Sequence, residues 1–231
     1  MPIPAVRVVD LWKFYDGDRP ETAALRGTNL EVAKGERVAL FGKSGSGKST
    51  LFNLIAGLDR PSRGRIEVEG QDLDALGEKG RTLLRRTRLG FIFQFFNLLP
   101  TLTVLENVFL SLELSNRRDP ERALFALREV GLEGKGNRFP SELSGGEQQR
   151  VAIARAMVKE PTLILADEPT GNLDTTTGNQ ILELLNRRCL ETRTTLIVAT
   201  HSPLTCRYVN RILRMVDGTI VETSLDEELT R

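Results

Sequence analysis

Short apolar runs separated by turn residues dominate the first third of the chain. The runs VRVVDLW (6–12), TNLEV (28–32), ERVALF (36–41) and RIEVEG (65–70) have the composition of β-strands. Within the third run, VALF is continuously apolar, which is typical of a strand buried in a parallel sheet. The following LFNLIAGL spaces its apolar residues for a helix that would end at Gly57. Residues 35–58 therefore predict a strand, a tight loop and a helix.

The pattern changes to a helical one from about residue 75 to 158. Helices are predicted over 78–89, 103–114 and 119–131, the last ended by Gly131, and RLGFIFQ (88–94) interrupts them as a strand. After residue 160 strands return at 161–168 and 194–200, with a helix over 175–193 between them. RILRMVDGTIVE (211–222) predicts a hairpin that turns at Asp217-Gly218. The pattern indicates an α/β core with a helical insertion between its two halves.

Composition narrows the class of protein. The 231 residues suit one domain with a substantial insertion, and 32 Lys plus Arg against 31 Asp plus Glu leave a net charge of +1. That balance gives no reason to expect nucleic acid as a partner. No apolar run reaches the 18 or more residues needed to cross a bilayer, and no signal peptide is visible. We therefore expect a cytosolic chain, with any membrane spanning left to another protein.

GKSGSGKS at 42–49 matches the G-x-x-x-x-G-K-[ST] phosphate loop, in the strand–loop–helix context that this motif requires. Glycines let several backbone N–H groups point at one anion, and the next helix adds its positive end. Lys48 would reach the β- and γ-phosphates, and the Ser49 hydroxyl would coordinate Mg²⁺. The residues expected to contact ATP here are Gly42, Lys43, Ser44, Gly45, Ser46, Gly47, Lys48, Ser49 and Thr50.

An acidic pair ends the predicted strand LILADE (163–168). Acids at the exit of a buried parallel strand point into the crevice where α/β sheets bind ligands. We expect Asp167 to hold Mg²⁺ and Glu168 to orient or deprotonate an attacking water. The two motifs together predict a nucleoside-triphosphate hydrolase or kinase.

A second glycine-containing segment, LSGGEQQR at 143–150, opens another predicted helix without a lysine. With GNLD (171–174), FIFQ (91–94), IVATHS (197–202) and LWKFYDG (11–17), it closely resembles motifs of the nucleotide-binding subunits of ABC ATPases, from about residue 6 to 222. The resemblance implies a P-loop core with a mainly parallel sheet and an N-terminal antiparallel β-subdomain (about 1–75 and 160–231). It also implies a helical subdomain over about 76–158, all within a single domain, 1–231. A P-loop kinase is disfavoured because LSGGEQQR would be unexplained.

The same resemblance assigns roles to residues outside the phosphate loop. Gln94 corresponds to the glutamine near Mg²⁺, His201 to the histidine that hydrogen-bonds the γ-phosphate, and Tyr15 to the aromatic residue that stacks on adenine. The segment LSGGEQQR would bind the ATP of a second copy in a head-to-tail homodimer, through Ser144, Gly145, Gly146 and Glu147. The loop that follows the catalytic glutamate is represented by Asn172, Leu173 and Asp174.

FIFQFFNLLPTLTVLENV and LADEPTGNLD resemble the lipoprotein-release, macrolide-efflux and cell-division types of the family. This implies an ATPase at the cytoplasmic face of the cell membrane that drives a membrane subunit, typically with four transmembrane helices, in export, efflux or lipoprotein release. ENVFLSLEL lacks a proline that this group often shows. Phe95, Phe96, Leu98 and Leu99 fit either core packing or a groove for that partner, and RTLLRRTR (81–88) is interpreted as a solvated helix face.

Two alternatives stay open. A cell-division ATPase would use the same chemistry to regulate a wall hydrolase. A soluble, non-transport ABC ATPase would normally carry a long coiled coil or two ATPase halves, whereas only 95 residues separate Lys48 from Leu143 here.

Overall fold

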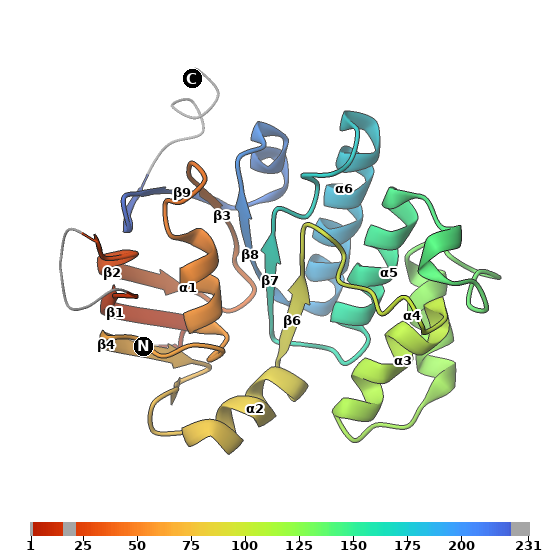
Figure 1. The fold of residues 1–231 in the computed structure, drawn as a ribbon, viewed down its shortest axis with the longest axis horizontal. Coiled ribbons are helices and arrows are strands. Elements are labelled where there is room, and N and C mark those ends of the chain that lie inside the picture. The colour runs from red at the N-terminus through yellow and green to blue at the C-terminus, as the bar shows by residue number, and fades with distance from the viewer. Residues whose placement is uncertain (1, 16–21, 223–231) are drawn as a thin grey trace.

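Two β-sheets frame the chain in the computed structural model, which describes residues 2–15 and 22–222 (Figure 1). In this described part, a four-stranded antiparallel sheet has the order β2 (Leu25–Val32), β1 (Val6–Lys13), β4 (Arg63–Val68) and β5 (Gln71–Asp72). A second sheet, of six strands, has the order β10 (Thr219–Glu222), β9 (Arg211–Val216), β3 (Arg37–Phe41), β8 (Thr195–Thr200), β7 (Leu163–Asp167) and β6 (Leu89–Ile92). All neighbours in the second sheet are parallel except the β9–β10 hairpin.

Helices cover the sheets and extend the molecule at one end. Helix α1 (Lys48–Ile55) lies between the sheets, and α6 (Thr175–Thr192) lies beside the large one (Figure 1). The other helices are α2 (Gly77–Thr87), α3 (Val104–Leu114), α4 (Pro120–Glu129) and α5 (Gly145–Met157), with short 3₁₀ turns η2 (Pro140–Glu142) and η3 (Pro203–Tyr208). Helices α3, α4 and α5 gather at the end of the molecule opposite the small sheet.

Apolar residues on the two faces of the large sheet enter different core clusters. On β3, Val38 and Leu40 pack in one cluster with α1 and the small sheet, whereas Ala39 and Phe41 pack in another with Ile212. A third cluster joins α3, α5 and α6 to strands β7 and β8. Burial on both faces explains why β3 reads as the continuous run VALF rather than as an alternating pattern.

The structure confirms the predicted α/β core and most element positions. Gly57, Gly131 and the Asp217-Gly218 pair all have positive φ, at the two predicted helix ends and the predicted hairpin turn. Within the segment assigned to the helical subdomain, β6 is a strand of the large sheet, so the helical part consists of α3, α4 and α5, whose core cluster also includes β7 and β8. No helix in the described residues is long and apolar enough to span a membrane.

The interpretation of residues 81–88 as a solvated face was wrong for its first residue. Arg81 is only 3% exposed, and its guanidinium donates to Glu78 (2.8 Å) and to the Leu73 carbonyl (3.3 Å). A long arginine stem can cover apolar surface while its head finds acceptors, which a charge pattern alone does not reveal.

Candidate functional site

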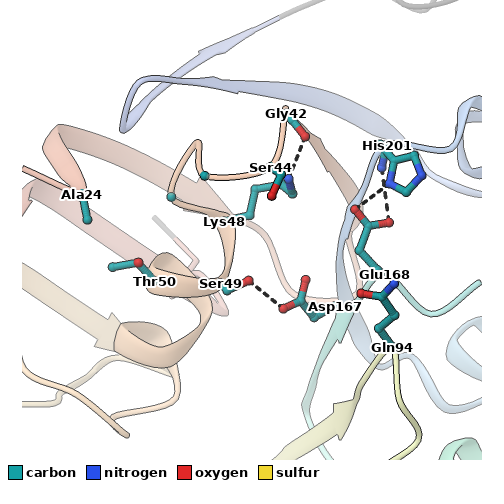
Figure 2. A pocket seen from close by; sticks show the side chains of 12 residues that line it. Ala24, Gly42, Ser44, Lys48, Ser49, Thr50, Gln94, Asp167, Glu168 and His201 are labelled. Atoms are coloured by element: carbon teal, nitrogen blue, oxygen red, sulfur yellow. Dashed lines mark hydrogen bonds and ion pairs between the residues drawn. The ribbon is translucent and has the colours of Figure 1, made fainter. Parts of the chain in front are cut away.

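The phosphate loop connects β3 to α1 and lines a cavity of about 530 Å³ (Figure 2). The loop can make this turn only with glycine at position 47, where φ is 107° and a Cβ would lie 2.6 Å from the Ala24 carbonyl oxygen. Helix α1 begins at Lys48, so its first N–H groups open toward the cavity without intrahelical acceptors. A cavity of this size lies in the range of small-molecule sites.

Lys48 supplies the positive charge of this cavity. The residue is 8% exposed, and Nζ donates to the carbonyls of Gly42 (2.6 Å) and Lys43 (3.1 Å). These are neutral acceptors of the loop itself. The ammonium is thereby held inside the loop and oriented for an anionic ligand, whose phosphate oxygens would be stronger acceptors.

Ser49 and Asp167 meet at one side of the cavity. The Ser49 hydroxyl donates to Asp167 Oδ2 at 2.8 Å, although the two residues come from α1 and the end of β7 (Figure 2). Burial raises the pKa of the Asp167 carboxyl, and the Ser49 hydrogen bond offsets part of that effect. A hydroxyl, a carboxylate and the nearby Gln94 amide are the oxygen donors that Mg²⁺ prefers, so this donor set fits the ion.

Glu168 stands next to Asp167 and faces His201. Glu168 Oε1 is 2.9 Å from His201 Nδ1, and the His201 backbone N–H donates to the same carboxylate at 3.4 Å. The Glu168 backbone is left-handed, with φ of 47°, and its N–H donates to the Ala199 carbonyl at 2.9 Å. Strained backbone of this kind persists where surrounding structure enforces it, commonly at functional sites. Here it directs the carboxylate into the cavity.

The segment after Glu168 is hydrogen-bonded to Gln94, another residue of the cavity lining. Asn172 Nδ2 donates to the Gln94 carbonyl at 2.9 Å. Asp174 caps α6 by accepting from the Thr177 N–H at 3.0 Å, and Leu173 packs against the cluster of the helical part. Movement of this segment would therefore shift the backbone of Gln94 through this hydrogen bond.

Helix α5 begins with a capping box. The Ser144 hydroxyl accepts from the Glu147 N–H (3.3 Å), and the Glu147 carboxylate accepts from the Ser144 N–H (2.9 Å) and also contacts Lys135 Nζ. Farther along, Gln149 is fully buried and donates to the Pro169 carbonyl at 2.7 Å. Helix α5 is thus bonded to the residue that follows Glu168.

The structure brings about half of the predicted site residues together around one cavity. The cavity is lined by Gly42, Ser44, Gly45, Gly47, Lys48, Ser49, Thr50, Gln94, Asp167, Glu168 and His201. Predicted contacts outside this lining are Lys43, Ser46, Tyr15, Ser144, Gly145, Gly146, Glu147, Asn172, Leu173 and Asp174. Tyr15 is 59% exposed; its hydroxyl donates to Asp59 at 3.3 Å and its ring faces the Lys13 ammonium.

Ala24 lines the cavity and was not predicted. It precedes β2 in the small sheet, and an alanine in a loop carries no signal that sequence reasoning could have used.

The apolar segment after Gln94 divides between the two uses that its sequence left open. Leu98 packs against the cluster of the helical part, whereas Phe95 and Leu99 are 72% and 44% exposed. Arg155 of α5 anchors the segment by donating to the carbonyls of Phe96 (2.7 Å) and Asn97 (2.5 Å). An exposed aromatic residue on an anchored loop is a candidate contact for another protein.

Comparisons with known proteins agree with this geometry. The family model described as "ABC transporter" matches residues 25–171. The lipoprotein-releasing system ATP-binding protein LolD of Pseudomonas syringae pv. tomato is 48% identical over 216 residues, covering 92% of this chain and 95% of that protein. The macrolide export ATP-binding/permease protein MacB of Syntrophobacter fumaroxidans is 43% identical over 93% of this chain and 31% of its own length.

Among solved structures, a dimeric ATP-binding cassette in a post-hydrolysis state with ADP and phosphate superposes with a TM-score of 0.85. It is 40% identical, and the match covers 95% of this chain and 98% of that one. Motif order, cavity geometry and these similarities lead to the same conclusion: the chain belongs to the ABC transporter family and is an ATP-binding, ATP-hydrolysing subunit.

Proposed function

We propose that two copies of this chain bind two ATP molecules between them, head-to-tail, and that the pair drives a membrane subunit from the cytoplasmic face. The observation that carries the proposal is the position of Ser144. It begins a helix whose first N–H groups can bind an anion, yet neither it nor its neighbours line the chain's own cavity. A second copy would bring this helix end to the γ-phosphate of ATP held by the first.

Within one cavity, Lys48 and the start of α1 would bind the β- and γ-phosphates. Ser49, Asp167 and Gln94 would hold Mg²⁺, directly or through water, and the ion would neutralise charge that develops on the phosphates. Glu168 would orient the attacking water and accept its proton. His201, now bonded to Glu168, would turn its ring toward the γ-phosphate. Tyr15 would reach the adenine from outside the phosphate cavity.

Loss of the γ-phosphate would remove the contact that differs between the closed and open pair. Inside each chain the change would travel along bonds that the structure contains. Asn172 joins the segment after Glu168 to Gln94, and Arg155 joins α5 to the loop that carries Phe95. ATP hydrolysis would thereby move the loop that carries the exposed Phe95 side chain.

Phe95 and Leu99 would contact the membrane subunit, which we infer to have four transmembrane helices. The resemblance to LolD and MacB supports export, efflux or lipoprotein release as the process served. The alternative, a cell-division ATPase, would use the same chemistry to regulate a wall hydrolase through its membrane partner.

The first experiment uses the Glu168→Gln chain, which should bind ATP but turn over roughly 10²–10⁴-fold more slowly. With ATP and Mg²⁺ its mass, measured by light scattering after gel filtration, should double, and ADP should leave it monomeric. Adding Ser144→Arg should abolish the dimer. ATP binding without any dimer in the parent variant would contradict the head-to-tail arrangement.

A second experiment addresses the membrane subunit. A pull-down with the tagged Glu168→Gln chain and ATP, from detergent-solubilised membranes of the organism that makes the chain, should recover a four-helix membrane protein. Adding Phe95→Asp should reduce the amount recovered. If only copies of the chain itself are recovered, the soluble, non-transport ATPase becomes the better model.

A further inference from the structure

Lys135 lies beside the start of α5 and contacts the Glu147 carboxylate. It comes from the loop that joins α4 to η2. Both side chains are partly buried, 31% exposed for Lys135 and 26% for Glu147. The Lys135 ammonium lowers the pKa of the Glu147 carboxyl, and the hydrogen bond from the Ser144 N–H lowers it further.

The position of Glu147 creates an electrostatic conflict. Its carboxylate lies in the first turn of α5, next to the Ser144, Gly145 and Gly146 groups that would bind a triphosphate. A carboxylate satisfies the capping box and the helix dipole, but it repels a second anion at the same helix end. Glutamine would give the same cap without the charge.

We propose that Lys135 is a charge-compensating residue of this ATP-binding segment, and that its ammonium neutralises Glu147 so that α5 can bind the partner chain's nucleotide. The inference rests on the proposed head-to-tail pairing and adds a residue to it. Lys135 would not touch ATP. It acts through Glu147, by cancelling a negative charge that lies beside the N–H groups of the helix end.

The loop around Lys135 does not depend on this side chain for its shape. The Lys135 backbone N–H donates to the Leu132 carbonyl (3.1 Å), and its own carbonyl accepts from the Arg138 N–H (3.1 Å). The capping bonds between Ser144 and Glu147 are likewise made without Lys135. Truncation of the lysine should therefore remove a charge without unfolding the segment.

The test measures the ATP concentration that half-dimerises the Glu168→Gln chain, at low and at high salt. Adding Lys135→Ala should raise this concentration roughly three- to tenfold at low salt, because an unpaired carboxylate then faces the triphosphate. High salt should shrink the difference. Adding Glu147→Gln to Lys135→Ala should recover most of the loss, since the amide keeps the cap and removes the charge.

Lys34→Ala is the matched control, because Lys34 pairs with Glu69 (2.6 Å) just after strands β2 and β4 of the small sheet, away from α5. It should leave the half-dimerising concentration unchanged, and thermal unfolding should show that all variants are folded. An unchanged value in Lys135→Ala, or a loss that Glu147→Gln does not recover, overturns the role of Lys135 alone. A parent chain that binds ATP and stays monomeric overturns the pairing and this inference together.

Discussion

The Glu168 carboxylate and the His201 ring are bonded to each other, with 2.9 Å between Oε1 and Nδ1. The two residues follow neighbouring parallel strands, β7 and β8, so the sheet itself sets their separation. The Glu168 side chain is 15% exposed and that of His201 is 71% exposed. Its exposure leaves the histidine as the partner that could move, and in the proposed mechanism it would leave the carboxylate when a γ-phosphate arrives.

Removal of this movable partner should slow hydrolysis more than binding. His201→Ala is expected to lower ATP turnover about 10²–10³-fold, the usual cost of a hydrogen-bond donor to the transition state. The affinity for ATP, measured by equilibrium titration of a fluorescent analogue, should change little because Lys48 and the loop remain. Turnover close to that of the unmodified chain would remove His201 from the mechanism.

Ser49 should set the Mg²⁺ requirement. The Ser49→Ala chain lacks the hydroxyl bonded to Asp167, so the Mg²⁺ concentration for half-maximal turnover should rise at least about tenfold. A titration of turnover with Mg²⁺ at saturating ATP measures this. An unchanged midpoint would show that the ion is held without Ser49.

Gly146 should be needed for packing as well as for binding. A Cβ at Gly146 would lie 2.5 Å from Thr177 Cγ2, and the Thr177 rotamer is fixed because its hydroxyl donates to Asp174 at 2.6 Å. Gly146→Ala should therefore lower the free energy of unfolding by about 1–3 kcal/mol, measured in urea without nucleotide.

The neighbouring glycine supplies the comparison. A Cβ at Gly145 would lie 3.4 Å from Leu173, an ordinary contact, so Gly145→Ala should destabilise the fold less than Gly146→Ala. Thr177→Ser deletes Cγ2 and keeps the hydroxyl, so it should restore stability to Gly146→Ala. Equal losses at both glycines, with no restoration, would refute the clash.

Local patterns predicted the fold and the phosphate cavity because their signals lie within short segments. VALF, the phosphate loop and the acids Asp167 and Glu168 each occupy a few consecutive residues, and parallel strands bring their ends to one edge. The roles of Ser144 and His201 came instead from the resemblance to a family.

Contacts between distant segments could not be predicted in the same way. Gln149 bonds to Pro169, and Lys135 contacts Glu147, only because α5 packs against particular loops. Arg81 is buried because Gly57 leaves room for its stem, with a hypothetical Cβ only 2.8 Å from the arginine Cδ. None of these pairs leaves a periodicity or a motif in the sequence.

Lys159 gives the stability of the fold a dependence on pH. The residue is partly buried beside α2, Nζ donates to the Arg85 carbonyl at 2.8 Å, and burial lowers its pKa from 10.5 to about 8. Between these two pH values the unfolded chain binds more protons at this residue than the folded chain. The contribution of Lys159 to the free energy of unfolding is therefore least favourable below pH 8 and improves as pH rises toward 10.5.

Lys159→Met isolates this effect, because other groups titrate over the same range in both chains. The free energy of unfolding of the lysine chain minus that of the variant should rise between pH 7 and 10, by up to about 3 kcal/mol. Urea denaturation at each pH measures it, with Lys34→Met as the exposed control whose difference should stay nearly constant. A constant difference for Lys159→Met would mean that the ammonium is solvated well enough to keep its ordinary pKa, and that the lysine contributes through its Arg85 hydrogen bond alone.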